Sequence, residues 1–138
     1  MKTFIHYYLQ SGAAAPFDGQ NSYGMSCPSI RYRNKCYYLA YSQESWHTAR
    51  DYCVRIGHTL TRIQSSDEAT FLASYLYEGI GKMLYWVDLN DERTEGVWTY
   101  SDGSVGYTEW WAVGEPNGNR GENCGLLVNI YSPSHNLF

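Results

Sequence analysis

Two short stretches late in the chain carry the side chains best suited to chemistry. They are Glu115-Pro116-Asn117 and Glu122-Asn123-Cys124, which together supply two carboxylates and two side-chain amides. Hard cations such as Ca²⁺ prefer oxygen ligands from carboxylates and amide carbonyls, and a sugar can offer a pair of hydroxyls to the same cation. These residues therefore predict a calcium-dependent carbohydrate site in a loop rich in turn-forming residues.

The same carboxylates allow a second interpretation, as a catalytic pair. Glu115 and Glu122 are of the residue type that glycosidases use, and histidines at positions 6, 47, 58 and 135 suit a hydrolase. However, none of these histidines lies near a nucleophile motif such as Gly-x-Ser-x-Gly. His47 follows Trp46 on a predicted helix and is interpreted as a surface or half-buried residue. We therefore predict a binding protein, not an enzyme.

The composition limits the class of partner. A chain of 138 residues is expected to form one domain. The net charge of −4 and the scattered basic residues argue against nucleic acid, and the alternating Arg31, Arg33 and Lys35 are interpreted as a solvated strand edge. No run approaches the roughly 20 apolar residues of a membrane span. Fourteen tyrosines and five tryptophans suit a loop-rich domain with many half-buried rings.

The pattern of apolar residues predicts an α+β domain. Residues 27–42 alternate in short β-prone pieces, and Ser42 or Ser45 is expected to cap a helix that stops at Gly57. A second helix is expected to start at Ser65 or Ser66 and to end at Gly79 or Gly81. Strand-like segments follow at 84–89, 97–100 and 124–130. The first helix has apolar residues at helical spacing: Trp46, Ala49, Tyr52, Cys53 and Ile56.

The amino-terminal residues and the cysteines bear on the cellular compartment. Residues 1–26 are rich in Gly and Ala and are expected to be a lead-in, or a poor signal-like segment, before a domain at 27–138. Four cysteines allow three pairings, and the absence of Cys-x-x-Cys argues against zinc. Buried free thiols in a cytosolic protein are one reading. Cys27 and Cys36 bracket a short segment suited to a stapled hairpin, which favours an oxidising compartment and a secreted or extracellular protein.

From Cys27 to about Val128 the sequence resembles a C-type lectin-like domain of the long form. The segment Tyr85-Trp86-Val87-Asp88-Leu89 is similar to the family's Trp-Ile-Gly-Leu core motif, with Asp88 in the place of the glycine. Further matching positions, in order along the chain, are Cys27-Pro28, Cys36-Tyr37, Trp46, Ala49, Cys53, Gly57, Leu60, Ile63, Glu68, Phe71, Leu72, Gly96, Trp98, Ser101-Asp102-Gly103, Trp110, Glu115-Pro116-Asn117 and Glu122-Asn123-Cys124.

The resemblance implies two helices, small antiparallel sheets and a long calcium-binding loop region. It implies a Cys27–Cys36 disulfide, and it implies that Cys53 and Cys124 each pair with a later cysteine that this sequence lacks. The Trp-Asn-Asp segment expected after the Cys124 strand is also missing. The resemblance therefore implies a domain truncated at its carboxyl end, without its final strands and with an open sheet edge.

The resemblance also implies ligands. Glu115, Asn117 and Glu122 correspond to calcium ligands of the main site, with a cis Glu115–Pro116 bond. The Glu-Pro-Asn motif is of the mannose type, which implies mannose, fucose or N-acetylglucosamine on glycans or glycoproteins.

Trp111 is the candidate for stacking on a sugar, whereas Trp46, Trp86, Trp98 and Trp110 are expected in the core. Asp91, Glu95 and Asn123 correspond to a second calcium site, expected to be weak because Gly118 and Asn123 replace two acids. The alternative is a lectin-like protein-binding module, or an inactive truncated form. The oligomeric state is left open, and the sequence contains no coiled-coil segment that would cluster the domain.

Overall fold

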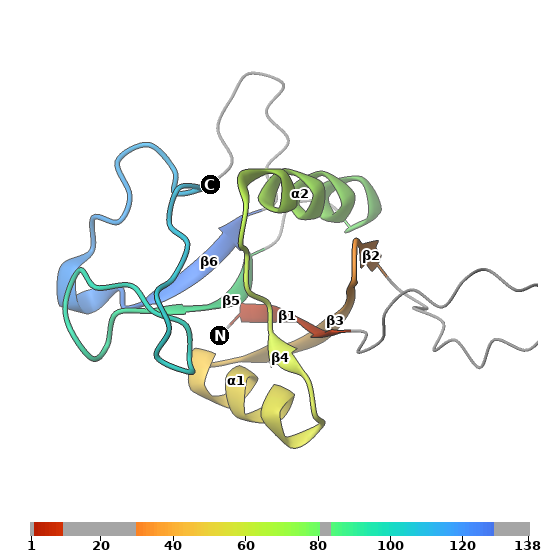
Figure 1. The fold of residues 1–138 in the computed structure, drawn as a ribbon, viewed down its shortest axis with the longest axis horizontal. Helices are drawn as coiled ribbons and strands as arrows, with labels where there is room; N and C mark the ends of the chain where they lie inside the picture. Colours follow the sequence, from red (N-terminus) through yellow and green to blue (C-terminus); the bar gives the residue numbers. More distant parts are fainter. Residues whose placement is uncertain (1, 10–29, 81–83, 129–138) are drawn as a thin grey trace, which may run out of the picture.

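The computed structural model of the chain describes residues 2–9, 30–80 and 84–128 (Figure 1). Within them the strands form one six-stranded sheet in the order β2-β3-β1-β5-β6, with β4 paired to β1. The elements are β1 (Lys2–Leu9), β2 (Ile30–Tyr32), β3 (Lys35–Glu44), α1 (Trp46–Arg55), β4 (Thr59–Leu60), α2 (Ser66–Ile80), β5 (Leu84–Asn90), a 3₁₀ turn η1 (Asn119–Gly121) and β6 (Cys124–Val128).

Helix α1 begins where the sequence predicts. The Ser45 hydroxyl accepts a hydrogen bond from the Thr48 N–H at 3.2 Å, which satisfies a donor that the first turn leaves free. The helix buries Trp46, Ala49 and Cys53 on one face. Gly57, at φ 75°, follows the helix in the left-handed conformation that glycine adopts most readily.

Helix α2 is capped in the same way, by the Ser65 hydroxyl, which accepts from the Glu68 N–H at 3.1 Å. Asp67 and Glu68 lie in its first turn, where the helix dipole favours negative charge. The helix continues through Gly79 to Ile80. In Figure 1 the two helices lie on opposite sides of the sheet, which confirms the predicted α+β architecture.

Two clusters of buried side chains hold these layers together. The larger includes Tyr37, Leu72, Tyr85 and Leu127 and lies beneath α2. The smaller consists of Trp46, Ala49, Cys53 and Leu60 beneath α1, with Trp86 and Cys124 packed against it. Each helix therefore has its own core on its own side of the sheet.

Strand β1 is the largest departure from the expected organisation. Lys2–Leu9 pairs antiparallel with β3 along its length and parallel with β5 at Thr3↔Tyr85 and Phe4↔Trp86. The segment is rich in aromatic and β-branched residues, which favour strands. Residues 2–9 thus belong to the sheet instead of a lead-in. The rest of the expected lead-in lies outside the described residues, and the boundary at residue 27 stays a prediction.

Lys35 was expected on a solvated strand edge with Arg31 and Arg33, and this prediction is wrong. The Lys35 side chain is buried, and its ammonium group lies 2.6 Å from the buried Glu68 carboxylate, which also accepts from the Tyr37 hydroxyl. A buried carboxylate needs such partners. Burial lowers the pKa of Lys35, and the bond to Glu68 opposes that shift. Arg31 and Arg33 are exposed as expected.

Candidate functional site

The predicted ligands lie in the long irregular region between β5 and β6, residues 91–123. Its first turn is closed by Asp91, whose Oδ2 accepts from the Gly96 N–H at 2.9 Å. Two isolated bridges, Asn90↔Thr99 and Thr99↔Val105, tie the next part of the region to the end of β5. The segment 97–100, expected to be a strand, contributes only these bridges.

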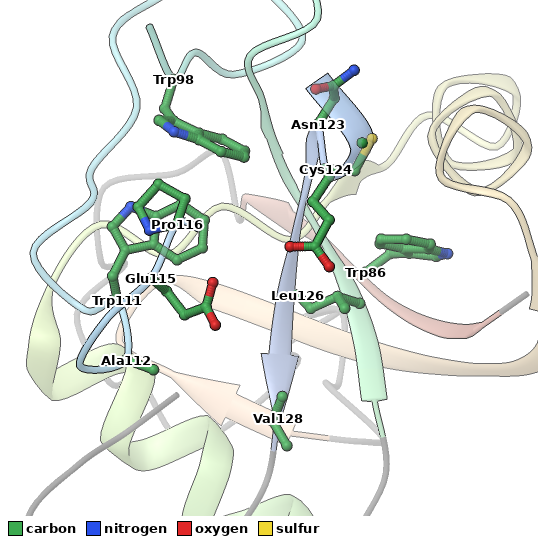
Figure 2. A pocket seen from close by; sticks show the side chains of 12 residues that line it. Trp86, Trp98, Trp111, Ala112, Glu115, Pro116, Asn123, Cys124, Leu126 and Val128 are labelled. Atoms are coloured by element: carbon green, nitrogen blue, oxygen red, sulfur yellow. The ribbon is translucent and has the colours of Figure 1, made fainter. Parts of the chain in front are cut away.

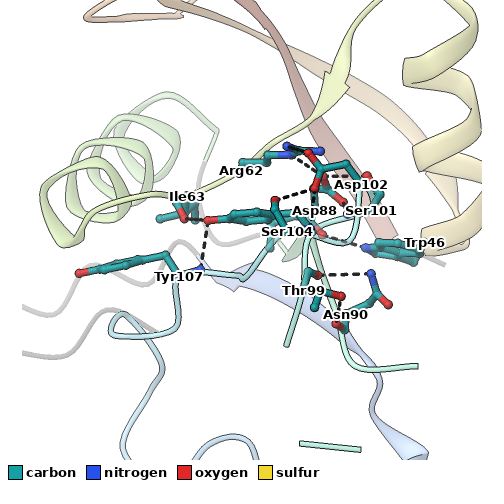
Figure 3. A network of polar contacts seen from close by, with 12 residues as sticks. Trp46, Arg62, Ile63, Asp88, Asn90, Thr99, Ser101, Asp102, Ser104 and Tyr107 are labelled. Carbon is teal, nitrogen blue, oxygen red and sulfur yellow. Dashed lines mark hydrogen bonds and ion pairs between the residues drawn. The ribbon is translucent and has the colours of Figure 1, made fainter. Parts of the chain in front are cut away.

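Asp88 anchors the same region to the core (Figure 3). Its carboxylate is fully buried and accepts three hydrogen bonds: from the Ser101 N–H at 2.9 Å, the Ser101 hydroxyl at 2.8 Å and Arg62 Nε at 2.7 Å. Arg62 also contacts Asp102 at 2.7 Å. The hydroxyl and backbone N–H of Ser104, followed by Arg62, hold the pKa of Asp102 well below its usual range. The acid in the glycine position of the core motif thus fixes the turn at 101–104.

The middle of the region is held by Tyr100. Its buried hydroxyl donates to the Ile63 carbonyl at 3.0 Å and accepts from the Tyr107 N–H at 3.1 Å. The Trp110 indole then donates to the Tyr107 carbonyl at 2.8 Å and is buried, as expected. The chain therefore enters the Glu-Pro-Asn segment from a fixed point.

Glu115 and Asn117 are brought together at the surface. The Glu115–Pro116 bond is cis, as the resemblance implies. Asn117 donates from its side-chain amide to Glu115 Oε1 at 3.0 Å and from its backbone to Oε2 at 3.2 Å. Both side chains are exposed. This leaves the Asn117 amide oxygen and the outer lone pairs of the carboxylate for a ligand.

Glu122 folds back over Gly118, next to Asn117. A Cβ added at Gly118 would clash with the Cβ, Cγ and carboxylate of Glu122, so glycine leaves room for the Glu122 side chain in this position. Among the described residues no three His, Cys, Asp or Glu side chains gather closely enough to hold a metal ion. The predicted main set is two carboxylates and an amide, an all-oxygen set of the kind that Ca²⁺ takes.

Two residues predicted for the second calcium site are also neighbours. The Asp91 N–H donates to the Asn123 carbonyl at 3.1 Å. Asp91 Oδ1 and Asn123 Oδ1 are both buried without a hydrogen-bond partner, and Asp91 as a whole is only 3% exposed. Glu95, the third predicted ligand, is exposed. Buried unpartnered oxygens are rare and need a donor, a water or a cation.

A cavity of about 590 Å³ opens beside these residues, and we call it the tryptophan groove (Figure 2). One wall is the 111–116 segment with Trp111, Pro116 and Glu115, whose carboxylate points towards β6. The opposite wall is the side of β5 and β6 that faces away from the core beneath α2. Its side chains include Trp86, Leu126 and Val128, and Trp98, Glu122, Asn123 and Cys124 also line the groove.

The groove changes the interpretation of three tryptophans. Trp86 and Trp98, expected in the core, are half-buried and line the groove, whereas Trp46 is buried as expected. Trp111, the predicted stacking residue, is half-buried and stacks on Trp110 at a centroid distance of 5.2 Å. The groove was not predicted, although Leu126 and Val128 lie at alternate positions of a strand that also buries Leu127, which is a usable signal for a second apolar face.

The cysteines fit the expected pattern in part. Cys53 and Cys124 contact the same small core cluster but form no disulfide. Burial, and then the negative charge of Asp88, raise the pKa of the Cys53 thiol to about 12. Cys36 is buried in β3. Cys27 lies outside the described residues, so the Cys27–Cys36 disulfide stays a prediction.

A mixed sheet between two helices, with polar ligand candidates confined to one long loop region, defines an α+β domain of the lectin type. The family model described as "Lectin C-type domain" matches residues 42–136, and the chain belongs to the C-type lectin domain family. Neither of the described helices is long and apolar enough to cross a membrane.

Similar proteins include a member of a C-type lectin domain family and an immunoglobulin Fc receptor. The chain is 32% identical over 96 residues to "C-type lectin domain family 4 member M" of Nomascus concolor, covering 67% of this chain and 24% of that protein. It is 37% identical over 105 residues to the "Low affinity immunoglobulin epsilon Fc receptor" of Mus musculus, covering 73% and 30%. This chain thus spans about a quarter to a third of the length of these relatives.

Solved structures share the fold. The carbohydrate-recognition domain of the mouse scavenger receptor C-type lectin aligns with a TM-score of 0.63 and 26% identity, covering 72% of this chain and 78% of that one. The corresponding human domain aligns with a TM-score of 0.65 at 24% identity, covering 74% and 81%, and supports the fold alone.

Proposed function

We propose that this domain binds carbohydrate through a calcium ion held by Glu115, Asn117 and Glu122, with a preference for mannose, fucose or N-acetylglucosamine. The observation that carries the proposal is the pairing of Glu115 with Asn117, beside a Glu122 carboxylate that lies over Gly118. An acid and an amide held together can each contact a sugar hydroxyl while sharing it with the cation. The Glu-Pro-Asn order is the basis for the mannose-type preference.

The number of ligands sets the expected strength. Calcium takes about 6–8 oxygens, and these three side chains supply about half of them. Sugar hydroxyls and water complete the shell in the proposed complex. We therefore expect calcium affinity in the millimolar range, increased when mannose is present because the sugar adds ligands.

We also propose a second calcium site at Asp91 and Asn123, with a lower calcium affinity than the main site. Asp91 Oδ1 and Asn123 Oδ1 are buried oxygens without donors, and a cation would satisfy both. Asn123 supplies a neutral oxygen where the resemblance expects an acid, so the site has less negative charge to attract Ca²⁺. Glu95, being exposed, would have to turn inward to join them.

The second candidate function is a lectin-like module that binds protein, or a form inactive towards sugars. It is favoured by the likeness to the mouse epsilon Fc receptor, whose name denotes an immunoglobulin ligand. In either case we propose action outside the cell, on glycans, glycoproteins or another surface protein, and no catalysis.

Calcium titration by calorimetry, with and without methyl α-mannoside, tests the first candidate. We expect saturable heat that mannoside strengthens and that Glu115→Gln removes, because the amide lacks the charge that holds the ion. Asp51→Asn is the matched control, since Asp51 is an exposed carboxylate on α1 paired with Arg50. Absence of heat at millimolar calcium in the unaltered chain would favour the protein-binding module.

A further inference from the structure

The side of β6 that faces away from the core beneath α2 is apolar. Gly125 and Leu127 are buried towards the core, while Leu126 and Val128 point the other way and line the tryptophan groove. On this side of the sheet Trp86 and Cys124 pack against the core beneath α1, whereas Leu126 and Val128 belong to neither core cluster and line the groove. Leu126 and Val128 therefore present apolar surface that the two described cores leave uncovered.

The groove walls are held in place. Trp86, whose neighbour in β6 is Leu126, donates its indole N–H to the Glu44 carbonyl at 2.9 Å. Trp98 and Trp111 meet edge to face at 4.9 Å, and Trp111 stacks on Trp110. The three indoles are therefore fixed by contacts within the protein. The volume of the groove, about 590 Å³, lies within the range of about 300–1,000 Å³ that is usual for small-molecule sites.

The groove is continuous with the proposed sugar site. Glu115 and Glu122 line the same cavity as Leu126 and Val128. Figure 2 shows the Glu115 carboxylate on the wall facing β6. A ligand held by its sugar at these carboxylates would carry its next group directly over indole and aliphatic surface. The cavity therefore has a polar end and an apolar end, which suit a glycoside that carries an apolar aglycone.

We propose that the tryptophan groove is a subsite for the apolar aglycone of a glycoconjugate, so that the ligand class is alkyl, acyl or aryl glycosides. The inference rests on the proposed function, because calcium and the sugar position the aglycone. The sugar would supply specificity through Glu115 and Glu122. The aglycone would add affinity because it moves out of water and onto the apolar surface of Trp86, Leu126 and Val128.

The test compares two ligands that differ only in their aglycone. Hexyl and methyl α-mannoside are titrated into the full chain in saturating calcium, with tryptophan fluorescence as a second readout. Each methylene that leaves water contributes roughly a fourfold gain, so partial burial of the hexyl chain is expected to tighten binding by roughly tenfold to a hundredfold. The fluorescence of the groove indoles should change more with hexyl than with methyl mannoside, because only the hexyl chain reaches Trp86.

Two variants locate the effect. Leu126→Asn and the milder, shape-conserving Val128→Thr should reduce the hexyl advantage and leave methyl mannoside binding unchanged. Val105→Asn is the matched control, because Val105 is 86% exposed and does not line the groove. Circular dichroism of each variant verifies the fold.

The outcomes separate this inference from the proposed function. If methyl mannoside binds and hexyl mannoside binds equally well, the aglycone subsite is refuted while the sugar site stands. If neither binds in calcium, the proposed function fails and the subsite fails with it. If the ligand-free chain is a dimer that Leu126→Asn converts to a monomer, the groove is an interface between copies and the subsite is refuted.

Discussion

Replacing Asp88 by alanine should be among the most damaging single changes in this domain. The carboxylate is 0% exposed and accepts from Arg62 and from two groups of Ser101. The change removes one member of a buried ion pair and leaves the Ser101 N–H without its acceptor. It also releases the turn at 101–104 from the core.

The magnitude follows from these partners. Breaking a buried ion pair from one side typically costs about 3–5 kcal/mol. Arg62 keeps Asp102 as a partner, which favours the lower part of that range for the pair itself, and the orphaned Ser101 N–H adds about 1–3 kcal/mol. We therefore expect a loss of about 4–6 kcal/mol, against a total stability of about 5–15 kcal/mol for a domain. The melting temperature should fall by roughly 15–20 °C.

Urea unfolding followed by tryptophan fluorescence measures this loss, with Asp102→Ala as the control. Asp102 is bound to the same Arg62, but its side chain is 52% exposed, so its removal should cost less than about 1 kcal/mol. The double variant Asp88→Ala with Arg62→Met should cost less than the sum of the single changes, because the two sites interact. A cost below about 1 kcal/mol for Asp88→Ala would show that water replaces its partners and that the anchor is not structural.

Three further outcomes are expected. Gly118→Ala should weaken calcium binding several-fold at unchanged melting temperature, because the added Cβ would displace Glu122. Gly121→Ala is the control and should leave calcium binding unchanged, because nothing lies within 4 Å of its added Cβ. Equal calcium affinities of the two variants in calorimetric titrations would contradict this prediction. Because the pKa of Asp102 is lowered in the folded state, its carboxylate adds to the free energy of unfolding at pH values above its ordinary pKa of 3.8. This contribution is lost as the pH falls below that value. The free energy of unfolding, measured in urea, should therefore change less between about pH 5 and pH 2.5 in Asp102→Asn than in the unaltered chain. The difference between the two proteins should be under about 1 kcal/mol. Since the pKa of Cys53 is raised to about 12, its thiol should react with a maleimide at about pH 8 only when the domain opens. Mass spectrometry locates the labelled cysteine. Fast labelling of Cys53 in the native protein would refute its burial.

The sequence predicted those elements whose signal is local. Helix α1 follows from a serine cap and apolar residues at positions 46, 49 and 53, and all of these are visible within ten residues. The Glu-Pro-Asn segment was found for the same reason, since its ligands are nearly adjacent in the chain. The structure adds the contact of Asn117 with Glu115, which residue order alone does not give.

What the sequence did not reveal depends on distant contacts. The burial of Lys35 requires Glu68, thirty-three residues later. Strand β1 requires partners in β3 and β5, and its aromatic residues suited a strand without showing where it would pair. The tryptophan groove arises between the 111–116 segment and β6, so no single stretch of sequence contains it.

The position of β1 sets a constraint on the order of folding. Lys2–Leu9 is synthesised before every strand it pairs with, and its partner Tyr85 in β5 is made about eighty residues later. Contacts so far apart in sequence slow folding. Until β5 emerges from the ribosome, the backbone N–H and C=O groups of β1 that pair with β5 have no partner strand. That interval is when this domain is most exposed to aggregation through β1, and slower translation between residues 9 and 84 would lengthen it.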